Sequence, residues 1–162
     1  MKADLAVPYI VSHAAAIVFA LIAWRRPSIA RWIAGLGFAL AGAFNLWTVS
    51  SNPQVYVDGF GPYAFSPYRE FIYGAFAQHT RACVTAIACG QMASGLLILS
   101  PLPWRRLGYA GAIVFLVAIT PLGFGSGAPS NLIFAAGVAR LLWQSRTKER
   151  TPVKPDPSGN AA

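Results

Sequence analysis

Long apolar runs alternate with short polar segments along this chain, and the basic clusters lie at the ends of those runs. Arg25, Arg26 and Arg31 stand between the first two runs, and Arg105 and Arg106 stand between two later ones. Hydrophobic residues make up 56% of the 162 residues and charged residues 11%, whereas soluble domains average about 25% charged. Because so few polar groups could not cover a surface in water, the pattern predicts an all-α integral membrane protein.

The runs predict one transmembrane domain, residues 1–145, built from five spanning helices. The expected spans are about 7–24, 29–50, 80–99, 107–122 and 130–144. The glycine-rich stretch between Pro121 and Pro129 separates the last two spans. A single helix over 107–143 would be about 55 Å long, against roughly 30 Å of hydrocarbon, so two short spans are preferred.

The charge distribution predicts the topology. Basic residues cluster at 25–31, at 105–106 and after the last run, which places those segments in the cytoplasm by the positive-inside rule. The N-terminus then lies outside and the polar tail, 146–162, is a disordered cytoplasmic segment of a plasma (inner) membrane protein. This alternation explains the net charge of +8 without nucleic acid as a partner.

Residues 51–79 form the one long connection. It holds four tyrosines and four phenylalanines among prolines and glycines. It is too polar to span the bilayer, and its aromatic content is typical of a segment at headgroup level. Ser66 and Pro67 predict the start of a short surface helix that runs towards Gly74.

Small residues recur at four-residue spacing in three spans. In that register they allow two helix backbones to approach closely. We expect helix packing at Gly35, Ala39, Ala43, Ala86, Gly90, Ser94, Gly108 and Ala112. Such faces favour self-association or a membrane-protein partner, with the lipid bilayer as the surrounding solvent.

Polar side chains that could carry chemistry cluster near the outer side. If the helices bundle, they would line an outer-leaflet pocket for a lipid head group or a quinone; the alternative is interfacial anchoring and interhelical hydrogen bonding. The candidate residues are His13, Asn45, Arg69, Glu70, His79, Arg81 and Gln91.

Other chemistry finds little support. His13 and His79, on different helices at similar depth, are candidate haem b ligands. His79 and Cys83 share a helix face, but no further metal ligand is evident, and Cys83 and Cys89 face different directions, which argues against a disulfide. No catalytic motif is present, and none of the five acidic residues lies in a span, which disfavours proton-coupled transport.

The block Gly90-Gln-Met-Ala-Ser-Gly-Leu-Leu-Ile-Leu99, followed by Trp104-Arg-Arg-Leu-Gly108 and by the short last helix after Pro129, resembles the DoxX-like small membrane proteins over residues 32–143. The resemblance implies a four-helix core and, in some members, association with quinone-linked redox complexes. This chain departs from the family in its extra first helix and in Gln91, which stands where an acidic residue is usual.

These features predict a non-catalytic accessory or assembly subunit of a membrane complex. Two alternatives stay open. One is a redox protein that binds a quinone or haem b in the outer pocket, and the other is a transporter for a small molecule or lipid.

Overall fold

In the computed structural model the chain is almost entirely helical. The structure describes residues 3–147, with side chains from Val7 onward except that of Phe124, and within this range no residue is in a strand. The first two residues of the tail predicted at 146–162 belong to the last helix, which continues to Thr147. The rest of that tail, from 148 on, lies outside the described residues.

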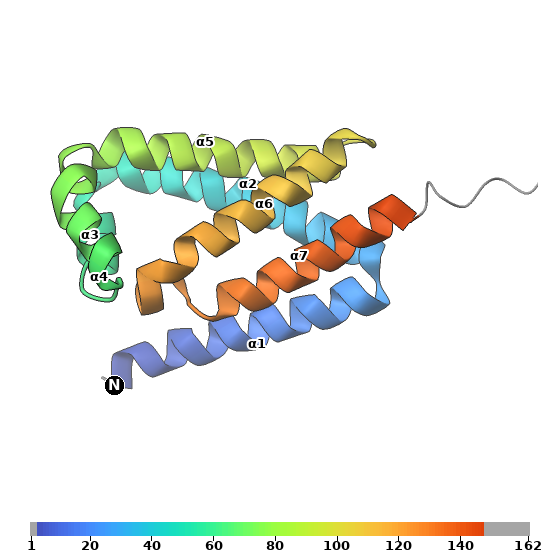
Figure 1. The fold of residues 1–162 in the computed structure, drawn as a ribbon, viewed down its shortest axis with the longest axis horizontal. Coiled ribbons are helices and arrows are strands. Elements are labelled where there is room, and N and C mark those ends of the chain that lie inside the picture. Colours follow the sequence, from blue (N-terminus) through green and yellow to red (C-terminus); the bar gives the residue numbers. More distant parts are fainter. Residues whose placement is uncertain (1–2, 148–162) are drawn as a thin grey trace, which may run out of the picture.

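Residues 3–147 form five long helices and four short ones, arranged as Figure 1 shows. The long helices are α1 (Ala3–Arg25), α2 (Pro27–Ser51), α5 (Thr80–Leu99), α6 (Trp104–Ile119) and α7 (Ser130–Thr147). The short elements are α3 (Gln54–Phe60), α4 (Ser66–Phe71), the π-helical turn η1 (Ile72–Phe76) and the 3₁₀ segment η2 (Thr120–Ser126). The span expected at 107–122 begins three residues later than α6. The reason is that the basic pair at 105–106, which was expected between two spans, lies inside the first turn of α6.

Four helices are long and apolar enough to cross a membrane: Val7–Arg25, Pro27–Ser51, Thr80–Leu99 and Trp104–Gly123. Large apolar side chains are exposed along all four, including Val18 on α1, Leu40 on α2, Leu96 on α5 and Val114 on α6. Exposing such side chains to water is unfavourable, so lipid is the solvent these surfaces fit. The helix α7, which contains Arg140 and Gln144, is not among the four.

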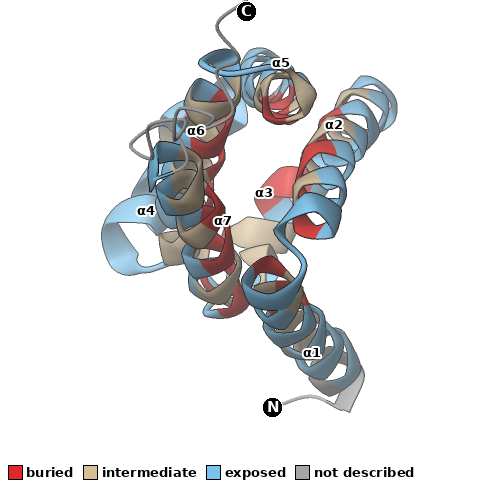
Figure 2. Cartoon of the chain, turned by 90° about the vertical axis from the view of Figure 1, so that its right-hand side faces the viewer, coloured by how far each residue is buried: buried red, intermediate tan, exposed pale blue. Residues whose placement is uncertain are grey.

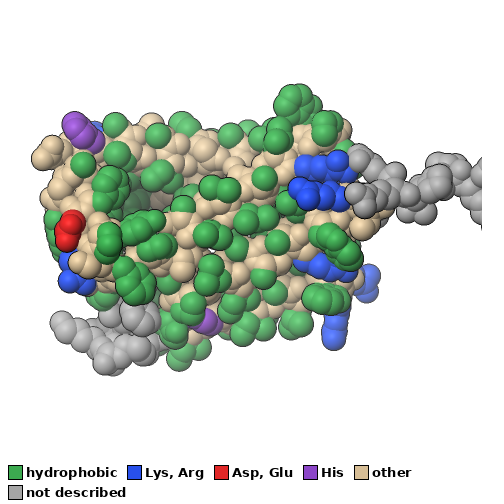
Figure 3. Space-filling view, viewed as in Figure 1, with side chains coloured by type: hydrophobic (Ala, Val, Ile, Leu, Met, Phe, Trp, Pro, Cys, Tyr) green, Lys and Arg blue, Asp and Glu red, His purple; other side chains and the backbone are tan. Residues whose placement is uncertain are grey.

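The long helices form a ring in the order α1, α2, α5, α6, α7, and α7 returns to pack on α1 (Figures 1 and 2). We call the end of the bundle that holds the α1–α2 turn, the α5–α6 turn and the end of α7 the basic end. Arginine side chains gather there (Figure 3). The opposite end, covered by α3 and α4, is the capped end.

Closest packing occurs between α2 and α5, and glycine makes it possible. A Cβ atom on Gly95 would lie 2.5 Å from the carbonyl oxygen of Gly35, and one on Gly42 would lie 2.6 Å from that of Ala88. These two backbones are therefore in direct contact over about two turns. Without a hydrophobic driving force between helices in lipid, such close van der Waals packing is a main source of association.

The small-residue register is only partly as predicted. Gly35, Gly108 and Ala112 are buried, and Ala39 and Ser94 are partly buried at helix contacts. In contrast, Ala43, Ala86 and Gly90 are exposed. The α2–α5 contact uses Gly42, Ala88 and Gly95 instead, because the crossing of the two helices turns those neighbours inward.

At the basic end, arginines attach α7 to the other helices. The guanidinium of Arg140 lies 5.2 Å from the ring centroid of Trp24 on α1 and 4.9 Å from that of Trp143. Arg106 on α6 donates a hydrogen bond through Nη2 to the carbonyl oxygen of Ser145, at 2.9 Å. Stacking on indole rings is a favourable environment for a guanidinium that leaves water.

The connection between α2 and α5 folds over the capped end. The predicted surface helix begins at Ser66, as expected, but becomes a π-helical turn from Ile72 and has non-helical backbone angles at Gly74 (φ −95°, ψ −108°). The sequence did not predict α3, because Gly59 and the prolines on either side of it favour a loop. Ile72, Phe76, Tyr56 and Val57 form a small core there with Val49 and Val84.

Substitution of Gly95 by alanine tests the backbone contact. The added Cβ forces α2 and α5 apart, and we expect the free energy of unfolding in detergent to fall by about 1–3 kcal/mol. Gly90→Ala is the control, because a Cβ there would meet no atom within 4 Å. Equal stability of the two variants in denaturant titrations followed by tryptophan fluorescence would contradict the packing described.

Candidate functional site

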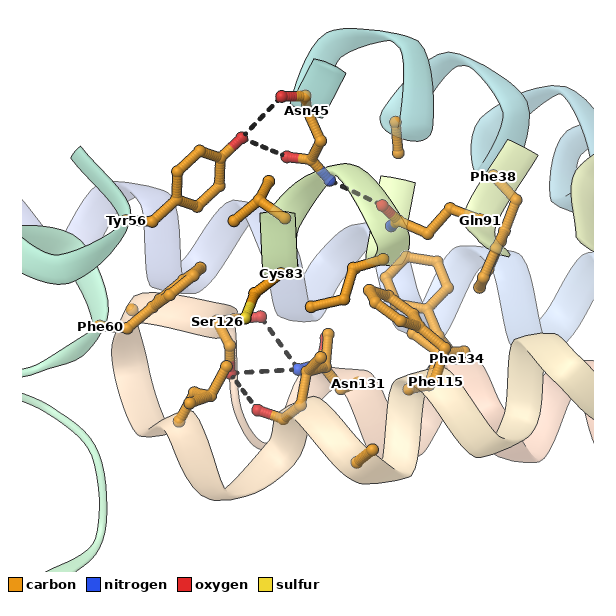
Figure 4. Close-up of a pocket in the computed structure, with 18 of the residues that line it drawn as sticks. Phe38, Asn45, Tyr56, Phe60, Cys83, Gln91, Phe115, Ser126, Asn131 and Phe134 are labelled. Atoms are coloured by element: carbon orange, nitrogen blue, oxygen red, sulfur yellow. Dashed lines mark hydrogen bonds between the residues drawn. The ribbon is translucent and has the colours of Figure 1, made fainter. Parts of the chain in front are cut away.

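A cavity of about 870 Å³ lies inside the ring of helices, towards the capped end. Every long helix and both short elements of the cap contribute to its wall (Figure 4). Its surface is almost wholly apolar. Phenylalanine side chains from seven elements line it: Phe19, Phe38, Phe60, Phe71, Phe76, Phe115 and Phe134.

Packed side chains close the cavity at both ends. Towards the basic end, the rings of Phe38 and Phe115 meet edge to face, with centroids 5.7 Å apart. Beyond them, the main core, which includes Ile98, Tyr109 and Leu141, fills the bundle. Towards the capped end, the small core of the cap covers it. Along the axis of the bundle, packed side chains therefore bound the cavity on both sides.

The cavity opens to the side instead. The helices α5 and α6 are in contact near the basic end, where a Cβ on Gly108 would lie 2.5 Å from the backbone nitrogen of Ile98, and they diverge towards α4 (Figure 1). Where they diverge, the lining residues Tyr68, Phe71 and Ile87 are themselves exposed, by 38%, 51% and 43%. This opening faces the surface that lipid would cover.

A chain of three polar side chains crosses one wall (Figure 4). The Tyr56 hydroxyl on α3 donates to Oδ1 of Asn45 on α2 at 2.8 Å and lies 3.2 Å from the Asn45 carbonyl oxygen. Nδ2 of Asn45 donates in turn to Oε1 of Gln91 on α5 at 2.7 Å. Burial raises the pKa of the Tyr56 phenol, so the hydroxyl stays protonated and remains a donor.

A second polar pair lies on the opposite wall, at the break between α6 and α7. Nδ2 of Asn131 donates to the carbonyl oxygen of Ser126 at 2.9 Å, and the Ser126 hydroxyl donates to the carbonyl oxygen of Ile119 at 2.8 Å. These bonds satisfy backbone groups that the irregular segment leaves without helical partners. We assign this pair a structural role in shaping the cavity.

The polar residues predicted to share one outer pocket are divided among several places. Asn45 and Gln91 lie together in the cavity wall. His79 and Arg81 line a separate surface pocket beside Gln54. The predicted residues do not line one pocket, because depth along a helix does not determine which face a side chain occupies.

The remaining predicted residues lie on surfaces away from the cavity. Arg69 and Glu70 are exposed on α4, where Arg69 donates to the carbonyl oxygen of Ala64 at 3.2 Å. His13 lies on α1 with Nδ1 2.8 Å from the carbonyl oxygen of Tyr9. His79 immediately precedes α5, is exposed and lines the surface pocket, to which His13 does not contribute, so the pair of histidines that a bis-His haem would need does not share a pocket.

Sequence reasoning missed several residues of the cavity. Tyr56 belongs to the aromatic segment that was expected at headgroup level, and Asn131 was not among the candidate residues. The seven phenylalanines come from segments spread along the sequence, so no local pattern links them. The sequence carries one signal for this site: each of two neighbouring helices has an amide within the membrane, Asn45 on α2 and Gln91 on α5.

Comparison of the chain with models of protein families, with curated proteins and with solved structures finds no match. The resemblance to the DoxX-like proteins therefore stays a prediction.

A double-mutant cycle on Asn45→Leu and Gln91→Leu measures the strength of the polar chain. We expect each single change to lower the free energy of unfolding by about 1–3 kcal/mol, because it leaves a buried partner unsatisfied. The double variant should show a coupling of about 0.6–1.7 kcal/mol. Strict additivity in denaturant titrations would mean that the amides do not interact.

Proposed function

We propose that this chain is a membrane protein that takes a largely apolar small molecule from the bilayer and holds it in the cavity. The single observation that carries the proposal is the shape of the cavity: it is closed at both ends of the bundle and open to the side. A binding site with this shape exchanges ligand with lipid and not with water. Its apolar wall with a few placed polar groups is typical of small-molecule sites.

Binding without chemistry fits the lining best. The wall offers three amides, hydroxyl groups and the thiol of Cys83 among apolar side chains, and its lining residues include no lysine, arginine, histidine or carboxylate. A general acid or base of ordinary type is thus missing from the residues that line it. The packed core on the basic side also disfavours the transporter alternative, which needs a polar path across the bundle.

We further propose five spans, with the N-terminus outside and the basic end in the plasma membrane's cytoplasmic leaflet. The support is that α7 runs beside α1 and α6 and ends among the arginines of the basic end. By the positive-inside rule these arginines favour the cytoplasm. A cysteine introduced after Thr147 that reacts from outside the cell with an impermeant reagent would contradict this topology.

Two glycine-to-leucine substitutions test the binding function. A Cβ on Gly37 or on Gly90 would meet no atom within 4 Å, but only Gly37 lines the cavity. We expect Gly37→Leu to fill part of the cavity and to reduce photolabelling of cavity residues by benzophenone about fivefold or more, since about 1 kcal/mol of binding energy corresponds to that factor. Gly90→Leu should label like the wild type.

Mass spectrometry of the labelled protein locates the adducts. Labelling at lining residues such as Ile119 and Leu122 supports the proposal. Labelling confined to the outer faces of the helices, with no difference between the two leucine variants, would contradict it.

A second function, that of an accessory subunit, is favoured by one surface. The outward face of α5 consists of exposed small residues over three turns, whereas the outward face of α2 carries large ones such as Trp32, Leu36 and Leu40. The small residues are Ala82, Ala86, Cys89, Gly90 and Ala93. A face of this kind lets a second membrane helix approach closely, as the DoxX-like resemblance would also suggest.

Gly90→Leu tests this second function as well. The leucine side chain should separate α5 from a packed partner and shift the protein, extracted from native membranes in mild detergent, to a smaller species on native gels. The Gly37→Leu variant should keep the size of the wild type. A wild-type protein that already migrates as a lone monomer would count against the subunit role.

A further inference from the structure

Gln91 has a spare hydrogen-bond donor inside an apolar cavity. Its side chain is 5% exposed, and its Oε1 already accepts from Asn45. Its Nε2 makes no hydrogen bond with the described residues, yet it is not enclosed by protein, because it is absent from the buried polar atoms that lack a partner. The cavity is the open space beside it (Figure 4).

The polar chain determines which end of the Gln91 amide faces the cavity. The Tyr56 hydroxyl is the donor that starts the chain, so Asn45 turns Oδ1 towards Tyr56 and Nδ2 towards Gln91. Gln91 must then turn its oxygen to Asn45 and its NH₂ group away from it. In the arrangement seen, the 2.8 Å bond from the Tyr56 hydroxyl to Oδ1 of Asn45 orients the first amide, and the 2.7 Å bond from Asn45 to Gln91 orients the second.

From this arrangement we infer that the ligand carries a hydrogen-bond acceptor, of the carbonyl type, which accepts from Nε2 of Gln91. The inference rests on the binding function proposed above and adds the chemical class: an apolar ring or chain bearing a ketone, quinone or ester carbonyl. A buried donor without an acceptor is costly in an apolar site. A carbonyl ligand removes that cost, whereas a pure hydrocarbon leaves it in place.

In this arrangement Tyr56 and Asn45 are positioning residues. They line the same wall as Gln91, and they act on the ligand's hydrogen bond through the orientation of the Gln91 amide. Removing the Tyr56 hydroxyl frees the two amides to reverse together, so that Gln91 would present its oxygen for part of the time. The affinity for an apolar molecule should not depend on this change, but the preference for a carbonyl should.

Benzophenone and diphenylmethane test the inference, because they differ only in a carbonyl group. Binding is measured in bicelles by equilibrium partition and expressed relative to the surrounding lipid. We expect the wild type to favour benzophenone about fivefold or more, the range of one hydrogen bond to a buried donor. The C=O stretching band of bound benzophenone should move to lower frequency.

Two variants show which residues produce the preference for benzophenone. Gln91→Met, which keeps the length of the side chain, should remove both the preference and the band shift while diphenylmethane still binds. Tyr56→Phe should reduce the preference for benzophenone over diphenylmethane. Because the band shift is measured on the wild type, a variant that fails to fold does not prevent the test.

The outcomes distinguish the inference about a carbonyl acceptor from the proposed binding function. If both probes bind the wild type equally and the C=O band is unshifted, the acceptor inference is wrong and the binding function stands. A preference for diphenylmethane or for diphenylmethanol over benzophenone would overturn the inference by showing that the chain of amides runs the other way. If neither probe binds above the level in lipid, the binding function itself fails.

Discussion

The direct backbone contact between α2 and α5 is the constraint on which the rest of the structure depends. Gly35, Gly42 and Gly95 bring the two helices so close that no side chain fits between them. This pair forms one rigid wall, and α1, α6 and α7 form the other side of the ring. The wall that α2 and α5 form is thin because the two helices are so close. The aromatic side chains of the opposite helices therefore do not fill the interior completely, and the cavity is the space that remains.

The polar groups of the interior follow from the same contact. Because α2 and α5 are so close, the amides of Asn45 and Gln91 meet at 2.7 Å, and α3 folds over the capped end so that Tyr56 can complete the chain. In lipid, a buried amide must find a partner within the protein. The donor that Gln91 keeps is thus a polar group of this wall that the fold leaves for a ligand, which connects packing to a choice of ligand.

Much of the architecture could be predicted from the sequence, because hydropathy and charge act locally. The span expected at 80–99 coincides with α5, and the break before Ser130 separates α6 from α7 as expected. The cavity could not be predicted in this way. Whether Ala43 or Gly42 faces α5 depends on a crossing angle, and whether Asn45 and His79 share a pocket depends on rotation about each helix axis. The helix α3 was missed because tertiary contacts of Tyr56 and Val57 stabilise a segment of weak helical propensity.

The central claim is that a molecule from the bilayer with a carbonyl acceptor occupies the cavity. It is tested most directly by mass spectrometry of the organic extract of the protein purified in lipid nanodiscs, compared with empty nanodiscs and with the Gly37→Leu protein. The account predicts a carbonyl-bearing apolar molecule enriched with the wild type and depleted with Gly37→Leu. An extract of the wild type that matches the bulk lipid, or an enriched molecule that Gly37→Leu retains fully, would contradict it.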